Sequence, residues 1–177
     1  MAEIPATTRG FTLIELLVTL TIATILLTVA VPNFVTFVQN NRLTSQANDL
    51  VTAFNYARSE AIKGAVPVTV CSRASNTACA GTTTWDAGYL VYVDTNRNGA
   101  PDAGEIMQVR EQLEGSNSLR AGASTQITYQ SSGFRSDGNG NDTFNLCDTR
   151  GAAPNGRSIN VNAQGRASVS TGAAACP

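Results

Sequence analysis

The chain has 177 residues and a formal net charge of −1, and it contains no histidine. This length is sufficient for one domain with a hydrophobic core and an additional segment. Without histidine, the chain lacks the commonest general base and the commonest metal ligand.

The first predicted element is an apolar helix near the N-terminus. The 21 residues from Phe11 to Val31 contain a single charge, Glu15, and as a helix they would extend about 32 Å, enough to cross a bilayer. Burying a carboxylate in hydrocarbon costs about 2.5–3.5 kcal/mol on insertion scales. We therefore expect Glu15 to have a partner or a function, the alternative being an anchor helix that tolerates it near the interface.

The polar residues 1–10, ending in Gly10, predict how the chain is processed. An ordinary secretory signal is cut after its apolar region at a small-residue site, and no convincing site follows this apolar run. The arrangement instead fits a cut between Gly10 and Phe11, which keeps the run in the mature protein. The segment GFTLIE, residues 10–15, resembles the class III signal of type IV prepilins and type II secretion pseudopilins. In that family a membrane peptidase cleaves after the glycine and methylates the new N-terminus.

The resemblance implies a role for Glu15 in assembly. After cleavage Phe11 would be the first residue, and Glu15 would lie one helical turn later on the same side. In pili of this family the glutamate neutralises the N-terminal amine of a neighbouring subunit, which favours the correct axial register. The family also implies other major and minor pilins and the prepilin peptidase as partners. It implies an inner-membrane protein with a periplasmic C-terminal domain, which later joins a filament at the cell surface.

Helical periodicity continues beyond the apolar run. Pro32 removes one helical hydrogen bond and is expected to kink or locally melt the helix. An amphipathic segment follows, and Gly64 and Pro67 mark its end. Its apolar positions repeat at spacings of four and three and predict one face packed on a sheet: Leu43, Ala47, Leu50, Phe54, Ala57 and Ala61. The predicted divisions are a leader at 1–10, a membrane or filament-core helix at 11–38, an amphipathic helix at 39–64 and a β-rich domain at 65–177.

After Gly64 the pattern changes to short β-rich runs between Gly, Asn and Ser clusters. A long helix followed by antiparallel strands is an α+β arrangement. It resembles the type IV pilin fold, a long N-terminal helix packed on an antiparallel sheet, and in particular the FimT/FimU and GspH group. Three segments carry that resemblance: LVTAFNYARSEAIK, TWDAGYLVYVDTNRNGAPDAGE, and the ending LCDTRG…GRSINVNAQGRASVS…C. The predicted strands are Val66–Cys71, Tyr89–Val93, Ile106–Arg110, Gln126–Gln130, Thr143–Cys147, Arg157–Val161 and Ala167–Ser170.

Four cysteines lie in the β-rich part. An even number of cysteines in a small exported domain predicts two disulfides, which can pair in three ways. The most local pairing joins Cys71 to Cys79 and Cys147 to Cys176. The chain has no C-x-x-C pair, which argues against zinc and redox sites.

Residues 94–105, DTNRNGAPDAGE, fit the pattern of a twelve-residue calcium loop. Flanking strands would make it a loop outside an EF-hand, and three carboxylates predict weak affinity. The alternative is a polar turn without metal. In the calcium reading the ligands are the side-chain oxygens of Asp94, Asn96 and Asn98, the carbonyl of Ala100, Asp102 through water and both oxygens of Glu105.

Arginines in the C-terminal part form a second candidate site. The sequence after Thr143 contains three arginines, Arg150, Arg157 and Arg166, and one acidic residue, Asp148. In some FimT-like members a G-R-x-R element helps to bind DNA for natural transformation. Here Gly165-Arg166-Ala167-Ser168 keeps only the first arginine, and non-specific DNA binding needs several phosphate contacts. Solvated arginines on turns are the alternative.

No sequence pattern supports catalysis. The chain lacks a G-x-S-x-G element and a glycine-rich phosphate loop between a strand and a helix. The sequence therefore predicts a structural protein, not an enzyme, with no required cofactor and no small-molecule substrate. The favoured function is a minor type IV pilin that helps to prime or assemble the filament, near its tip. The alternatives are a DNA-binding minor pilin for DNA uptake and a GspH-like minor pseudopilin of type II secretion.

Overall fold

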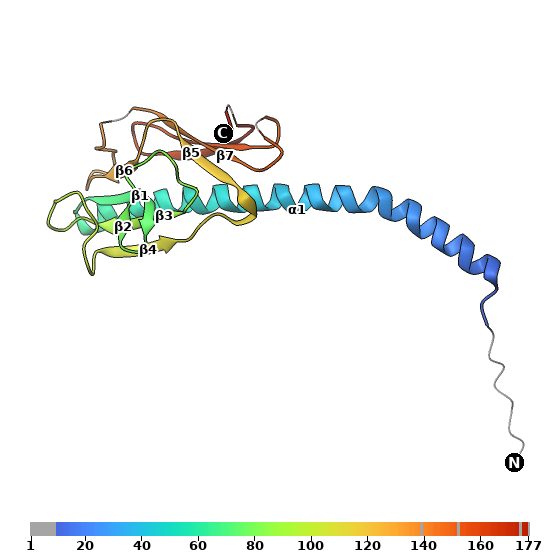
Figure 1. The fold of residues 1–177 in the computed structure, drawn as a ribbon. Helices are drawn as coiled ribbons and strands as arrows, with labels where there is room; N and C mark the ends of the chain where they lie inside the picture. The colour runs from blue at the N-terminus through green and yellow to red at the C-terminus, as the bar shows by residue number, and fades with distance from the viewer. Residues whose placement is uncertain (1–9, 139, 152, 174, 177) are drawn as a thin grey trace, which may run out of the picture. The chain divides into compact units, whose positions relative to one another are not determined.

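The computed structural model describes residues 10–138, 140–151, 153–173 and 175–176. The predicted leader at 1–10 lies outside these residues except for Gly10. The chain divides into two compact units between Val38 and Gln39. One helix, α1 (Leu13–Gly64), contributes residues to both units (Figure 1).

The first unit consists of the apolar half of α1. The backbone is helical on both sides of Pro32, so the expected local melting does not occur, while a kink there stays a prediction. Proline lacks an amide hydrogen and leaves one carbonyl of the preceding turn without its helical partner. A single missing bond is tolerated inside a helix of 52 residues because the turns on either side remain bonded.

In the second unit the amphipathic half of α1 packs one face on the β-rich part. All six apolar positions of the predicted stripe are buried, from Leu43 to Ala61, which confirms the periodicity. Ala53 and the polar Gln46 are also buried on this face. Gln46 is bonded there: it donates to the carbonyl of Glu114 (3.1 Å) and accepts from the side chain of Asn117 (2.7 Å).

The strands form two antiparallel sheets beside this half of α1 (Figure 1). The first sheet has the order β2-β1-β3-β4, with β6 paired to β1, and the second has the order β5-β7-β8-β9. The predicted strands all occur; Tyr89–Val93, Ile106–Arg110 and Arg157–Val161 have the predicted bounds, and the ends of the others are shifted by one to four residues. The structure adds β2, β5 and a short 3-10 turn, η1, because these segments are too short or too polar to give an alternating pattern. The bounds are β1 Val68–Ser75, β2 Ala78–Cys79, β3 Tyr89–Val93, β4 Ile106–Arg110, η1 Glu114–Ser116, β5 Ser118–Ala121, β6 Gln126–Tyr129, β7 Asp142–Cys147, β8 Arg157–Val161 and β9 Ala167–Thr171.

The core of the second unit forms where α1 and both sheets meet. Phe144 of β7 lies between Phe54 of α1 (ring centroids 5.3 Å apart) and Trp85 (5.0 Å, edge to face). The indole N–H of Trp85 donates to the carbonyl of Ser124 (3.2 Å), so the buried ring leaves no donor unpaired. Disulfides join Cys71 to Cys79 and Cys147 to Cys176, the most local of the three pairings.

Candidate functional site

The start of α1 holds the predicted register residue. The amide of Glu15 donates to the hydroxyl of Thr12 (3.3 Å), and the amide of Thr12 donates to Oε2 of Glu15 (3.4 Å). This reciprocal pair is a capping box, which satisfies two amides that a helix start leaves unpaired. Glu15 therefore has a partner within its own chain. The signal for this cap is the spacing T-x-x-E at residues 12–15, which the interpretation of Glu15 as a register residue does not include.

The side chains of the first unit are exposed along its length. Phe11 is 87% exposed and Leu27 59% exposed, and the other large apolar residues up to Val35 are at least 48% exposed. α1 is long and apolar enough to cross a membrane by length and composition. Threonine hydroxyls here donate to carbonyls three or four residues earlier, as Thr21 does to Leu17 (2.8 Å) and Thr24 to Leu20 (2.7 Å). Because these polar groups are bonded within the helix, they can enter an apolar environment at low cost.

The loop 94–105 is closed by its own hydrogen bonds. The carboxylate of Asp94 accepts from the amides of Asn98 and Gly99, both at 3.0 Å. Glu105 accepts from the amide of Thr95 (2.9 Å), from the Thr95 hydroxyl and from the amide of Asp102 (3.2 Å). Two of the six residues predicted to bind calcium, Asp94 and Glu105, thus accept N–H and O–H donors of their own loop.

Hydrogen bonding also sets the ionisation of this loop. The Thr95 hydroxyl, with the amides of Thr95 and Asp102, holds the pKa of Glu105 below its ordinary value of 4.5 against the opposing effect of burial. A lowered pKa in the fold stabilises the loop above pH 4.5, and that stabilisation is lost as the pH falls through the lower folded value.

The loop also covers the outer face of the first sheet. Tyr92 of β3 is fully buried, and its hydroxyl donates to the carbonyl of Gly99 (3.0 Å). Cys71 and Leu90 complete the small apolar cluster beneath it. Within the described residues, no group of three or more His, Cys, Asp or Glu side chains is placed to hold a metal. The calcium loop and the polar turn without metal both stay predictions.

The structure does not bring the three predicted DNA-binding arginines together. Arg150 bonds to Asp148 (Nη2 to Oδ2, 2.6 Å) and to the side chain of Asn40 (2.8 Å). Burial would raise the pKa of Asp148, but the hydrogen bonds from Arg150 outweigh it, so the pKa is lowered. Arg157 donates to the hydroxyl of Thr44 (3.3 Å). Both arginines are therefore engaged near the same stretch of α1.

Arg166 lies at the other end of the β8–β9 hairpin. Arg157 pairs with Thr171, whereas Arg166 directly precedes Ala167, the partner of Val161. The length of one five-residue strand, about 17 Å, separates the two arginines along the sheet. DNA binding by a single patch of three arginines has no support in this arrangement.

Gly165 fixes the turn before Arg166. Its φ is +79°, and a Cβ there would lie 2.6 Å from Cε1 of Tyr129 and 3.0 Å from the carbonyl oxygen of Gly133. Glycine alone fits this close approach at a positive φ without strain. The arginine that follows is therefore presented by a rigid turn.

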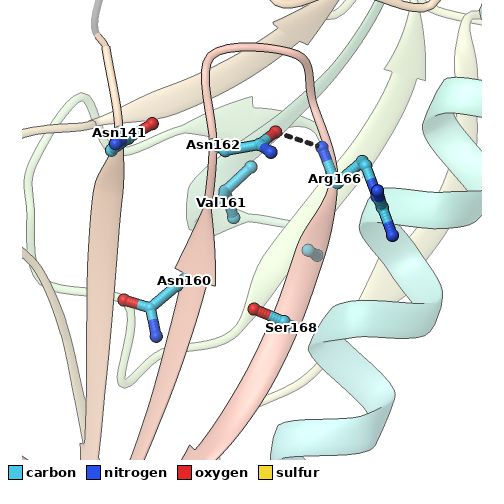
Figure 2. Close-up of a pocket in the computed structure, with 7 residues that line it drawn as sticks. Asn141, Asn160, Val161, Asn162, Arg166 and Ser168 are labelled. Atoms are coloured by element: carbon cyan, nitrogen blue, oxygen red, sulfur yellow. Dashed lines mark hydrogen bonds between the residues drawn. The ribbon is translucent and has the colours of Figure 1, made fainter.

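A hollow of about 420 Å³ lies beside that turn (Figure 2). It is formed by residues just before β7, in β8, in the β8–β9 turn and in β9. No sequence pattern predicts this hollow, because its residues come from separate segments and match no spacing pattern. The lining residues are Asn141, Asn160, Val161, Asn162, Arg166, Ala167 and Ser168.

Comparisons with known proteins identify the family. The family model described as Type II transport protein GspH matches residues 46–165, more than half of the chain. The model of the prokaryotic N-terminal methylation motif matches residues 6–31. No curated protein matches the sequence.

Two crystal structures of the type IV minor pilin FimU from Pseudomonas aeruginosa (strain PAO1) are similar to this chain. The alignment with the P21 crystal form has a TM-score of 0.63 at 18% sequence identity. It covers 80% of this chain and 99% of the FimU chain. The alignment with the P65 form has a TM-score of 0.59 at 18% sequence identity, and it covers 76% of this chain and 100% of the FimU chain. This likeness shows the type IV pilin fold. The chain therefore belongs to the GspH family of minor pilins and pseudopilins.

Proposed function

We propose that this protein is a minor pilin that enters a type IV pilus through its apolar helix and helps to prime or assemble the filament, near its tip. The observation that carries the proposal is the difference in side-chain exposure between the two halves of α1. Its N-terminal half exposes apolar side chains from Leu13 to Val35, whereas its C-terminal half is buried along one face in its own domain. An exposed apolar surface of this extent needs a membrane or other helices around it.

The proposed pathway has two environments for the same helix. The chain first sits in the inner membrane with its β-rich domain in the periplasm, where the prepilin peptidase cuts between Gly10 and Phe11. The helix then leaves the lipid and packs among the helices of other pilins in the filament. The internally bonded threonines suit both environments, since neither supplies water.

Glu15 would set the register at the second step. In the subunit, Oε2 accepts the Thr12 amide, and within the described residues Oε1 has no bonded partner. We propose that Oε1 receives the N-terminal amine of Phe11 from a neighbouring subunit. A carboxylate away from water finds its counter-charge only when the subunits are correctly aligned, so misaligned insertion costs free energy.

Two functions of Glu15, capping and charge, can be separated by substitution. Glutamine also serves as the third helical residue of a capping box, so Glu15→Gln keeps the cap and removes the charge. Thr12→Ala removes the cap and keeps the charge. If charge sets the register, we expect Glu15→Gln and Glu15→Ala to reduce incorporation into sheared filaments at least tenfold, about 1.4 kcal/mol, while Thr12→Ala has a smaller effect.

Incorporation would be measured by immunoblot of sheared pili against the same protein in the membrane fraction. Equal membrane levels of all variants are the control for insertion. Wild-type incorporation of Glu15→Gln would refute the register mechanism, and a loss with Thr12→Ala alone would assign the glutamate to capping.

A minor pseudopilin of type II secretion is the second candidate, favoured by the description of the family model that matches residues 46–165. Deleting the gene separates the two functions. Loss of surface pili with normal protein secretion supports the pilus function, and the reverse result supports the pseudopilin. Normal pili and normal secretion would contradict both. No contact among the residues that the structure describes favours the DNA-uptake alternative.

A further inference from the structure

The hollow beside the β8–β9 turn has a polar row along one side. Asn160 of β8 is the register partner of Thr143 in β7 and of Ser168 in β9. Residues directly opposite in a sheet point to the same face, so these side chains form one row. Figure 2 shows Asn141 near the start of β7, across from the hairpin that carries Asn160, Asn162 and Arg166.

Hydrogen bonds fix which ends of two asparagine side chains remain free. Oδ1 of Asn162 accepts the backbone N–H of Arg166 (2.8 Å), marked by the dashed line in Figure 2. Oδ1 of Asn141 accepts the backbone N–H of Ala163 (3.2 Å). Only the oxygen of a side-chain amide can accept from an N–H. The NH₂ groups of both residues are therefore left as donors.

The remaining polar groups of the lining are also suited to donate. Asn160 engages its Oδ1 with the Thr143 hydroxyl (2.7 Å), and Ser168 is exposed. Arg166 is exposed and supplies the single formal charge among the lining residues. Within the described part of the chain, its guanidinium has no bonded partner.

Among the described residues that line the hollow, none has a carboxylate that could compensate this charge. The nearest in sequence is Asp142, which is buried. Its carboxylate turns away and accepts the amides of Ala123 (3.2 Å), Ser124 (2.8 Å) and Thr143 (2.8 Å). The hollow thus offers amide and guanidinium donors, one positive charge and few free acceptors.

We propose that this hollow binds a carboxylate side chain, Asp or Glu, of a neighbouring pilin subunit. A carboxylate has two oxygens that accept several bonds and one negative charge, which match the donors and the single charge of Arg166. The identity of the partner rests on the proposed function as a filament subunit. Nucleic acid fits less well, because it needs several cationic contacts and stacking aromatic rings. The described lining residues include one arginine and no aromatic residue.

Binding can be followed on the full chain in detergent micelles, through the NMR signals of the Asn141 and Asn162 side-chain amides. The probe is N-acetyl-glutamate amide, and N-acetyl-glutamine amide is its uncharged control. We expect saturable shifts with the glutamate probe alone. Inorganic phosphate and a six-nucleotide single-stranded DNA test the competing anions.

Two variants test the donors without removing the turn. Asn162→Asp keeps the oxygen that accepts the Arg166 amide and replaces the donor with a negative charge, and Arg166→Gln removes the positive charge. We expect each to weaken glutamate binding about tenfold. The matched control is Arg97→Gln, an exposed arginine in the 94–105 loop, which should bind as the wild type does. Unchanged thermal unfolding shows that the variants fold.

No shift with the glutamate probe, equal shifts with the glutamine control, or unchanged binding by Arg166→Gln would overturn the proposal. DNA or phosphate binding as tight as glutamate binding would also overturn it. The result is independent of the filament experiment. A chain that binds glutamate but never enters pili refutes the proposed function alone, and a chain that enters pili without binding glutamate refutes this site alone.

Discussion

At the scale of single residues, a buried ion pair stabilises the region between the two sheets. The side chains of Arg135 and Asp137 are 1% and 3% exposed, and Nη2 lies 2.5 Å from Oδ2. Arg135 also donates to the carbonyls of Gly140 (2.8 Å) and Val161 (3.1 Å) and to the hydroxyl of Ser124 (3.2 Å). The guanidinium thus bonds to the end of β8, to the loop before β7 and to the segment between β5 and β6.

We predict that Arg135→Met lowers the free energy of unfolding by about 3–5 kcal/mol, because it removes the Arg135 half of a buried ion pair. The double variant Arg135→Met/Asp137→Leu should lose less than the single variant. Urea unfolding followed by the fluorescence of Trp85, the only tryptophan in the sequence, measures both. Equal losses in the two variants would show that the bonds to carbonyls dominate over the charge.

At the scale of elements, the 94–105 loop acts as a cover. Its two buried carboxylates, Asp94 and Glu105, accept amides of the same loop and hold Gly99 over the Tyr92 hydroxyl. The aspartate, asparagine and glycine content of the sequence is the same for a calcium loop and for this turn, so composition could not separate them.

We predict that millimolar calcium leaves the melting temperature unchanged, and calorimetric titration should give no binding heat. Asp94→Ala removes an acceptor for two amides and should cost about 1–3 kcal/mol. Asp94→Asn keeps one oxygen as acceptor and should cost less. A calcium-dependent rise in melting temperature that Asp94→Asn abolishes would restore the metal interpretation.

At the scale of the whole molecule, the disulfides restrain loops of unequal length. Cys71 and Cys79 are 8 residues apart and join β1 to β2. Cys147 and Cys176 are 29 residues apart and attach the C-terminal segment to the end of β7. In the chain-entropy model a longer closed loop restrains the unfolded chain more.

Removing the disulfide that closes the longer loop should therefore lower the free energy of unfolding more. We predict a loss of about 3–4 kcal/mol for Cys147→Ala/Cys176→Ala and about 2–3 kcal/mol for Cys71→Ala/Cys79→Ala. Denaturant unfolding of the oxidised full chain in detergent is the measurement, and non-reducing peptide mapping checks the pairing. The reverse order would mean that packing of buried Cys71, not loop closure, dominates.

Local patterns were sufficient to predict most of the elements. The spacing of Leu43, Phe54 and Ala61 located the buried face of α1, and alternation located the strand predicted at Thr143–Cys147. These predictions succeed because a helix or strand buries a face whose period is written along the chain. The strand β5 was not predicted because its alternation extends over only the four residues SLRA.

The sequence by itself determined the class of protein: the methylation motif, the apolar run and the α+β order follow from contiguous residues. Only the tertiary structure decided which side chains meet. It divided the strands into two sheets, separated Arg166 from Arg150 and Arg157, and gathered Asn141, Asn162 and Arg166 around one hollow. The physical reason is that a site depends on strand register and on which donors remain unpaired after folding, and neither quantity is local in the chain.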